Sequence, residues 1–262
     1  MSIIPKPKQL RPSLHGRMLG LGDNQEIIVN DQVVVPGPAY RGQRCILFDD
    51  FNGDALDAQW GVQSGSDGSA LDPAVNSQAG GVCRLVGGSS NTSLAADGSQ
   101  LERYLCWEAD KGDLELECML KLDAITTVQV FIGFTDQVGS LEMPIYSAAS
   151  ADTITTDASD AVGFFFDTQM TTDDWWLAGV AADTDATQAD SGKAPTAATY
   201  QRFKIMLDES GNAKFWIDGD EVGTVDSAVT ASTLLTPVVC VRRLAASLIN
   251  ADLDYIYVAQ DR

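Results

Sequence analysis

The sequence has a single histidine among its 262 residues, and this excludes several kinds of active site. His15 lies in a proline-containing stretch near the start of the chain, so a Ser-His-Asp or Cys-His site would depend on a residue outside every predicted strand. A zinc site built from several histidines is excluded within one chain, and there is no CxxC pair. Histidine-dependent and zinc-dependent chemistry are therefore not predicted.

Basic residues are scarce: 17 Lys and Arg stand against 37 Asp and Glu, which gives a net charge of −20. Such a charge disfavours nucleic acid and anionic membranes as partners, because both are recognised through Lys and Arg. The charge is unevenly divided. Residues 1–44 hold six basic and three acidic residues, whereas residues 45–262 hold eleven and thirty-four. A basic N-terminal segment therefore precedes an acidic body.

Disulfide, secretory and transmembrane patterns are also lacking. The five cysteines are odd in number and widely spaced, which predicts buried, reduced thiols. The first twenty residues contain no apolar core of a secretory signal, and no run approaches the ~18 apolar residues of a membrane span. These absences favour a protein made in a cytoplasm, with no membrane partner.

The most informative segment is Tyr200–Val225. Apolar residues alternate there with Arg202, Lys204 and Met206; they are Phe203, Ile205 and Leu207. Polar turns at 209–212 and 218–220 separate this segment from two further strand-like segments. Period-two alternation interrupted by Gly, Asn and Asp predicts antiparallel strands with one buried face.

Further strands are predicted along the body, and helical periodicity is absent throughout. The clearest is 113–123, where five apolar residues alternate with Glu115, Glu117, Met119 and Lys121. The other predicted strands cover 82–86, 126–134, 161–167, 174–180, 237–241 and 253–258. Long loops at 147–160 and 181–199 separate some of them, and such loops often carry function.

Two of these segments resemble concanavalin A-like (laminin-G-like) jelly-roll domains. The turn-containing hairpin of 200–225 resembles their late strands, and Cys45–Trp60, with the pattern F-D-D-F-N-G…L-x-x-x-W, resembles their first strand. The resemblance implies an all-β jelly-roll sandwich over residues 45–262. Residues 1–44 are predicted to form an extended basic arm, with a short β-hairpin at 26–35 around Asn30 and Asp31.

Family-16 glycosidases with this fold carry E-x-D-x-E or E-x-D-x-x-E on one strand. Here Glu115 occupies the first position, and Glu117 stands where the pattern has Asp. The two lie about 6–7 Å apart at the backbone and so share a face. The third position falls on Met119 or Leu120, neither of which is acidic. Because glycoside hydrolysis needs a paired acid and base, the sequence predicts that the protein is not an enzyme.

Two kinds of binding site have candidates in the sequence. Sugar rings stack on exposed aromatic residues. One of the consecutive pair Trp175 and Trp176 is expected to face outward, and Trp216 is expected either outside the sandwich or between its sheets. Interfaces also favour tryptophan, so contact with another sheet, a loop or a subunit is the alternative. The resemblance further implies a possible structural calcium, for which the candidates are Asp50, Asn52 and Asp254. No other cofactor is expected.

The combination of arm and body resembles tailed-bacteriophage virion proteins, especially capsid decoration proteins. This implies a non-enzymatic virion protein, made in the host cytoplasm, that binds the major capsid protein and neighbouring copies of itself as a homo-oligomer, a trimer by resemblance. The residues expected to bind these partners are Lys6, Lys8, Arg11, Arg17, Val33 and Val35. The alternatives are a lectin-like module that binds host glycans and a divergent, inactive glycosidase.

Overall fold

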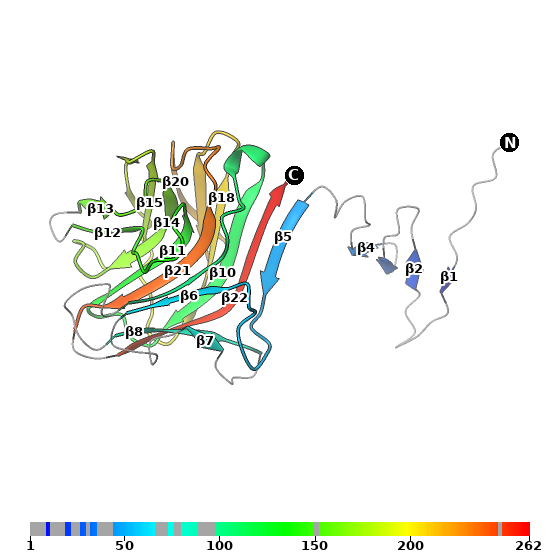
Figure 1. Ribbon diagram of the computed structural model, residues 1–262, viewed down its shortest axis with the longest axis horizontal. Helices are drawn as coiled ribbons and strands as arrows, with labels where there is room; N and C mark the ends of the chain where they lie inside the picture. The colour runs from blue at the N-terminus through cyan, green and yellow to red at the C-terminus, as the bar shows by residue number, and fades with distance from the viewer. Residues whose placement is uncertain are drawn as a thin grey trace. The chain divides into compact units, whose positions relative to one another are not determined.

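In this computed structural model, the segments with alternating or continuous apolar residues form the strands of two antiparallel β-sheets (Figure 1). The structure describes residues 44–65, 73–75, 80–88, 98–148, 152–245 and 248–262, together with the backbone of four short strands before residue 44. The chain divides into two units, Met1–Cys45 with Asp261–Arg262, and Ile46–Gln260. The second unit is called the body below.

The first unit contains one four-stranded sheet in the order β1-β2-β3-β4. Its strands are β1 Gln9–Leu10, β2 Leu19–Leu21, β3 Ile27–Val29 and β4 Gln32–Val35. β3 and β4 are paired antiparallel, which confirms the strands of the predicted hairpin, while its turn residues Asn30 and Asp31 lie outside the described residues.

Sheet I has the order β20-β19-β18-β10-β22-β8-β7, and β5 pairs with β22 outside this path. Its strands are β5 Arg44–Asp49, β7 Ala74–Val75, β8 Cys83–Gly87, β10 Leu114–Leu122, β18 Tyr200–Leu207, β19 Ala213–Ile217, β20 Asp220–Val225 and β22 Ile249–Asp261. The hairpins predicted over 200–225 are therefore confirmed as β18, β19 and β20.

Sheet II has the order β16-β15-β14-β11-β21-β9-β6, and β17 pairs with β15. Its strands are β6 Gly61–Ser64, β9 Gly98–Glu102, β11 Val128–Thr135, β14 Ala161–Asp167, β15 Trp176–Ala181, β16 Thr184–Asp185, β17 Ala189–Asp190 and β21 Thr236–Arg243. Within the described residues the remaining elements are the hairpin β12 Ile145–Ser147 and β13 Ile154–Thr156, and the 3-10 turn η2 Ala109–Lys111.

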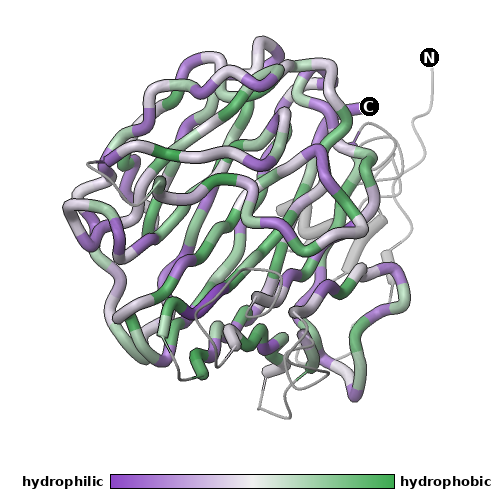
Figure 2. Tube along the Cα trace, turned by 60° about the vertical axis from the view of Figure 1, so that its left-hand side comes forward, coloured by the Kyte–Doolittle hydropathy of each residue, from purple (hydrophilic) through white to green (hydrophobic). Residues whose placement is uncertain are grey.

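The two sheets pack face to face around an aromatic core. Phe164 of β14 makes edge contacts with Phe203 and Phe215 of sheet I, at centroid distances of 5.2 and 5.1 Å. Trp175 packs against Phe203 at 4.6 Å. Hydrophobic and hydrophilic residues alternate along several strands (Figure 2), as expected where a sheet buries one face. The predicted all-β sandwich is confirmed.

The described helical structure gives no indication of a membrane span, because no helix has the required length and apolarity. Three cysteines, Cys83, Cys118 and Cys240, are buried and free, as predicted. Burial raises the pKa of the Cys83 thiol to about 12, so it stays protonated at neutral pH. Cys106 is exposed and Cys45 is half-buried, so the expectation of burial fails for these two.

Candidate functional site

The outward side of sheet I carries polar and aromatic side chains and is called the open face. On β10, Leu114, Leu116, Cys118, Leu120 and Leu122 are buried in the core, so the intervening side chains face outward. The same alternation on β18 and β19 turns Arg202, Lys204 and Met206, and Lys214 and Trp216, to this face. The side chains of three neighbouring strands therefore form one surface.

Strand register brings the outward residues into rows across the sheet. Glu117 of β10 lies opposite Lys204 of β18 and Tyr257 of β22, and Lys204 in turn lies opposite Trp216 of β19. An adjacent row places Glu115 beside Met206. Sheet pairing thus assembles a carboxylate, a cation and two aromatic rings from distant parts of the sequence.

Hydrogen bonds hold the two glutamates in place. The Tyr255 hydroxyl donates to Glu117 Oε1 at 2.6 Å, and the Tyr257 hydroxyl donates to Glu115 Oε1 at 3.3 Å. Glu115 also forms an ion pair with Lys204, whose Nζ lies 3.0 Å from Oε2. Burial and the neighbouring Glu117 carboxylate raise the pKa of Tyr255, so its hydroxyl remains a donor.

A β-bulge in β22 alters the open face beside Met119. The register shifts between Met119, opposite Tyr255, and Leu120, opposite Leu253. Asp254 is the extra residue, and both it and Tyr255 are half-exposed between the buried Leu253 and Ile256. The bulge therefore adds an acidic side chain near the position where the glycosidase pattern has its third carboxylate.

Two cavities lie on this face and share Met206 and Trp216. The larger has a volume of about 520 Å³ and is lined also by Asp113, Asp208, Lys214 and Asp226. The smaller, of about 220 Å³, is lined by Glu117, Arg202, Lys204 and Gly219 besides the two shared residues. We call the two cavities together the groove, with Trp216 and Met206 at their junction.

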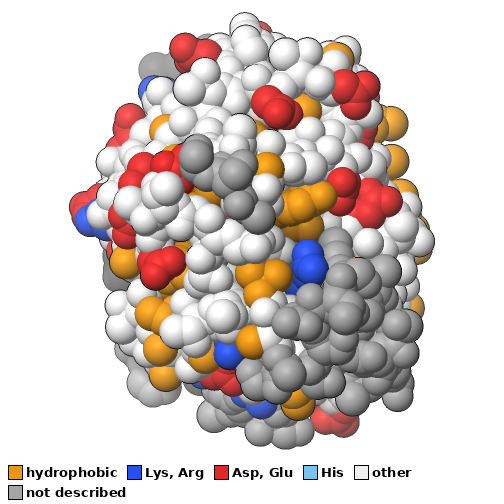
Figure 3. All heavy atoms as spheres, turned by 90° about the vertical axis from the view of Figure 1, so that its left-hand side faces the viewer, with side chains coloured by type: hydrophobic (Ala, Val, Ile, Leu, Met, Phe, Trp, Pro, Cys, Tyr) orange, Lys and Arg blue, Asp and Glu red, His pale blue; other side chains and the backbone are white. Residues whose placement is uncertain are grey.

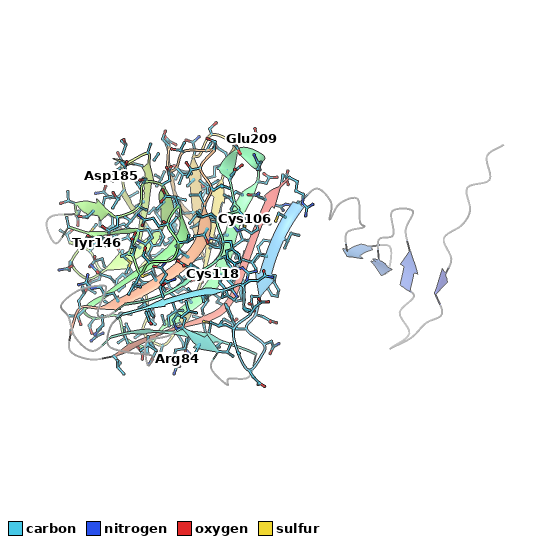
Figure 4. All side chains as sticks on the ribbon, in the orientation of Figure 1. Arg84, Cys106, Cys118, Tyr146, Asp185 and Glu209 are labelled. Atoms are coloured by element: carbon cyan, nitrogen blue, oxygen red, sulfur yellow. The ribbon has the colours of Figure 1, made fainter. Side chains whose placement is uncertain are left out.

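A network of charges flanks the groove on the open face. Asp252 of β22 accepts hydrogen bonds from Arg84 Nε at 2.7 Å and Nη2 at 2.9 Å, and its Oδ2 lies 2.9 Å from Lys121 Nζ. Burial alone would raise the pKa of Asp252, but the hydrogen bonds and charges of these two cations outweigh it and lower the pKa. Arg84 and the Glu209 turn mark opposite ends of the body (Figure 4).

The three tryptophans expected to bind sugar have different surroundings. Trp216 is half-buried at the groove, in agreement with an outward side chain. Trp175 is 1% exposed in the core between the sheets, and its Nε1 donates to Gln201. Trp176 points to the other side of sheet II, as expected for one of the pair, but it is only 7% exposed, which fits the alternative expectation of contact with another sheet, loop or subunit.

The cause of Trp176 burial is a second hydrophobic cluster on the outward side of sheet II. Trp176 stacks on Phe165 at 6.3 Å, and residues from the β12–β13 region, including Met143 and Ile145, cover the pair. This outward side of sheet II is called the covered face below. The loop that contains β12 and β13 gave no sequence signal of such a role.

The calcium candidates come from two segments of the chain, and their role stays a prediction. Asp50 and Asn52 lie after β5, where Asn52 Nδ2 donates to Asp50 Oδ2 at 3.4 Å, while Asp254 lies in β22. Among the described residues, no three His, Cys, Asp or Glu side chains are grouped to hold a metal ion. Lys6, Lys8, Arg11 and Arg17, and the side chains of Val33 and Val35, lie outside the described residues, so their role stays a prediction.

No family profile and no curated protein sequence matches the chain. Solved structures do match. A Bacillus licheniformis β-glucanase aligns with a TM-score of 0.55 and 12% identity over 81% of this chain and 97% of that chain. The carbohydrate recognition domain of Emp47p aligns with a TM-score of 0.54 and 10% identity, over 84% and 97% of the two chains. The body has the concanavalin A-like jelly-roll fold.

A third solved structure with this fold comes from another kind of enzyme. A structure described as an endo-acting O-glycanase from human gut microbiota aligns with a TM-score of 0.56 and 9% identity, over 82% of this chain and 98% of that chain. Enzymes and a recognition domain thus share the fold, and identities this low establish the fold alone. None of these comparisons supports the capsid decoration role expected from the sequence, which stays a prediction.

Proposed function

We propose that the body is a carbohydrate-binding module that holds an oligosaccharide in the groove without cleaving it. The observation that carries this proposal is the position of Trp216, a half-buried ring at the junction of two cavities lined by charged and hydrogen-bonding side chains. Ligand sites typically combine an apolar floor with a few placed polar groups. The similarity of the fold to a β-glucanase and to a carbohydrate recognition domain supports the same choice.

Absence of hydrolysis is proposed from the residues on β10. Glu115 and Glu117 are present, but the thioether of Met119 cannot exchange a proton, and Leu120 is 2% exposed and points into the core. A glycosidase needs both a proton donor and a base or nucleophile placed across the scissile bond. Reducing-end assays on β-glucans and mucin glycans should therefore show no release above a protein-free control. Release that disappears in Glu115→Gln or Asp254→Asn would overturn this part of the proposal.

Intrinsic fluorescence provides a direct test of binding, because the described residues include all five tryptophans and four of them are buried. Trp60, Trp107, Trp175 and Trp176 are between 1% and 7% exposed, so Trp216 should dominate quenching by acrylamide. Titration with a panel of neutral and acidic hexasaccharides should shift the emission and protect it from the quencher for at least one ligand.

Calorimetry with variants then links binding to the groove. Trp216→Ala should weaken binding at least tenfold, about 1.4 kcal/mol, while Trp216→Phe retains part of the affinity. Tyr104→Ala is the matched control, because Tyr104 is 66% exposed and does not line the groove. No binding to any ligand in the panel, or equal binding by Trp216→Ala, would refute carbohydrate recognition at this site.

A further inference from the structure

The basic residues of the body are concentrated on the open face. Residues 45–262 hold eleven Lys and Arg against thirty-four Asp and Glu. Five of the eleven belong to the strands of the open face, namely Arg84, Lys121, Arg202, Lys204 and Lys214. Acidic side chains are spread over the face shown in Figure 3, where few basic ones are visible. The surface that contains the groove is thus unusually rich in cations for so acidic a body.

Three of these five cations are already neutralised by carboxylates. Arg84 and Lys121 share Asp252, and Lys204 is paired with Glu115. Within the described part of the chain, Arg202 and Lys214 form no side-chain ion pair. Both are exposed, and Arg202 lines the smaller cavity while Lys214 lines the larger. The groove therefore contains two cationic side chains that no carboxylate of the described residues neutralises through an ion pair.

The backbone of Arg202 is fixed although its side chain is unpaired. Its N–H donates to Asp218 Oδ1 at 2.9 Å, and its carbonyl accepts from the Asp218 N–H at 2.8 Å. Gly219 follows in the turn with φ +91°, and a Cβ at that position would lie 3.2 Å from Arg202 Nη2. The glycine leaves room for the guanidinium, which extends along the turn beside the smaller cavity.

The two cavities differ in charge, and this distinguishes their ligands. The smaller cavity combines Arg202 and Lys204 with Glu117, whose carboxylate already accepts the Tyr255 hydroxyl. The larger cavity has Lys214 together with Asp113, Asp208 and Asp226. Carboxylates of the larger cavity suit the hydroxyl groups of a neutral sugar and repel an anion, whereas the smaller cavity offers the unpaired fork of a guanidinium.

We infer that the groove selects an acidic oligosaccharide, with the carboxylate of a uronate residue held by Arg202 in the smaller cavity. This rests on the proposed carbohydrate-binding function and specifies its ligand class. A guanidinium binds a planar carboxylate through two parallel hydrogen bonds, a geometry that an ammonium group cannot match. Without a local cation, a body with a formal charge of −23 would repel such a ligand.

Matched ligands test the inference in the full-length protein. Three hexamers are compared with their methyl esters, which keep the size and linkage but remove the charge. Two consist of galacturonate and of mannuronate, and the third alternates glucuronate with a neutral sugar. At least one free acid should bind tenfold or more tightly than its ester, and raising the salt concentration should reduce this preference. Arg202→Gln should abolish the preference, because it should weaken binding of the free acid at least fivefold more than binding of the ester.

The control is Lys111→Gln, which removes the same charge from an exposed cation paired with Glu108 and Asp110 outside the groove. It should leave the preference for the acid intact, and Arg202→Lys should restore it only in part. Equal binding of acid and ester, or a preference unaffected by Arg202→Gln, would overturn the inference while leaving carbohydrate binding standing. Binding restricted to sulfated galactan hexamers would overturn the assignment to a carboxylate. No binding by any hexamer, neutral or acidic, would refute the proposed function itself.

Discussion

The two outward faces of the sandwich are both built from antiparallel strands, but one is accessible and the other is covered. On the open face of sheet I, Glu115, Lys204 and Trp216 stay partly accessible and line or border a groove. On the covered face of sheet II, Phe165 and Trp176 are buried beneath the β12–β13 region. The difference shows that strand alternation alone does not decide which sheet face stays accessible, because in this body a loop region covers one face and not the other.

The two faces should differ most in their contribution to stability. Phe165→Ala removes a ring that is 1% exposed in the second cluster, and it should lower the free energy of unfolding by about 3–5 kcal/mol. Met206→Ala on the open face should cost less than about 1 kcal/mol because its side chain already contacts solvent. Urea unfolding of both variants measures the difference. Equal losses would mean that the covered face is not a second core.

Asp252 is a buried carboxylate of the open face that is paired with two cations, Arg84 and Lys121. Asp252→Asn should cost about 2 kcal/mol at pH 7, less than a fully buried pair, because Arg84 and Lys121 keep 35% and 21% exposure. The folded pKa of Asp252 is lowered, so its stabilisation is present above the unfolded value of 3.8 and is lost as pH falls through the folded pKa. The difference between wild type and variant should therefore shrink between pH 5 and pH 2 in urea unfolding.

A buried carboxylate associated with sheet II provides the comparison for this pH dependence. Burial raises the pKa of Asp167, and hydrogen bonds from Gln169, Ser147 and Gln129 offset this only in part. A raised folded pKa makes its contribution most favourable below pH 3.8 and less favourable as pH rises through the folded pKa. The difference in unfolding free energy between wild type and Asp167→Asn should thus change with pH in the opposite direction to that for Asp252→Asn. A change in the same direction for both variants would contradict the opposite pKa shifts of the two carboxylates.

A smaller effect is expected from the tyrosines that hold the glutamates. Tyr255→Phe removes the 2.6 Å hydrogen bond to Glu117 while keeping the ring near Phe48, and should cost about 1 kcal/mol. Tyr257→Phe removes a longer bond of 3.3 Å and should cost less. Thermal unfolding of both variants tests the order, and the reverse order would show that the shorter bond is not the stronger one.

The smallest effect on the body is expected from the N-terminal segment. Deleting residues 1–22 should change the melting temperature of the body by less than about 2 °C, because the segment lacks the apolar periodicity of a core element. If the segment binds neighbouring copies, the deletion should also lower the mass in solution measured by light scattering. An unchanged oligomer after deletion would remove the expected role of Lys6, Lys8, Arg11 and Arg17.

Much of the fold follows from local patterns in the sequence. The alternation around Glu115 and Glu117 correctly predicts β10, and the turns after Leu207 and Ile217 correctly predict β18 to β20. The continuous run Phe164, Phe165 and Phe166 also has a physical explanation, because a strand buried on both faces needs no alternation. These signals lie within single strands or hairpins.

The site could be predicted only in part, because it depends on contacts between distant segments. The place of Trp216 among buried neighbours on β19 left two possibilities, outside the sandwich or between its sheets, and the structure shows the first. The burial of Trp176 depends on Met143, Ile145 and Ala158, which pack in the same cluster. The place of Arg202 beside Trp216 depends on the pairing of β18 with β19. No local pattern encodes which loop covers which sheet, so the accessible face had to come from the structure.

The pairing of β5 with β22 has a consequence for engineering the chain. These are the first and last strands of the sandwich, and they lie side by side in sheet I (Figure 1). A circular permutant of the body could therefore join its two ends through a short linker. New ends could be opened in the exposed part of the turn between β18 and β19, at Glu209 and Ser210. Such a permutant would carry its fusion point beside the groove, where an attached reporter could sense an occupied site.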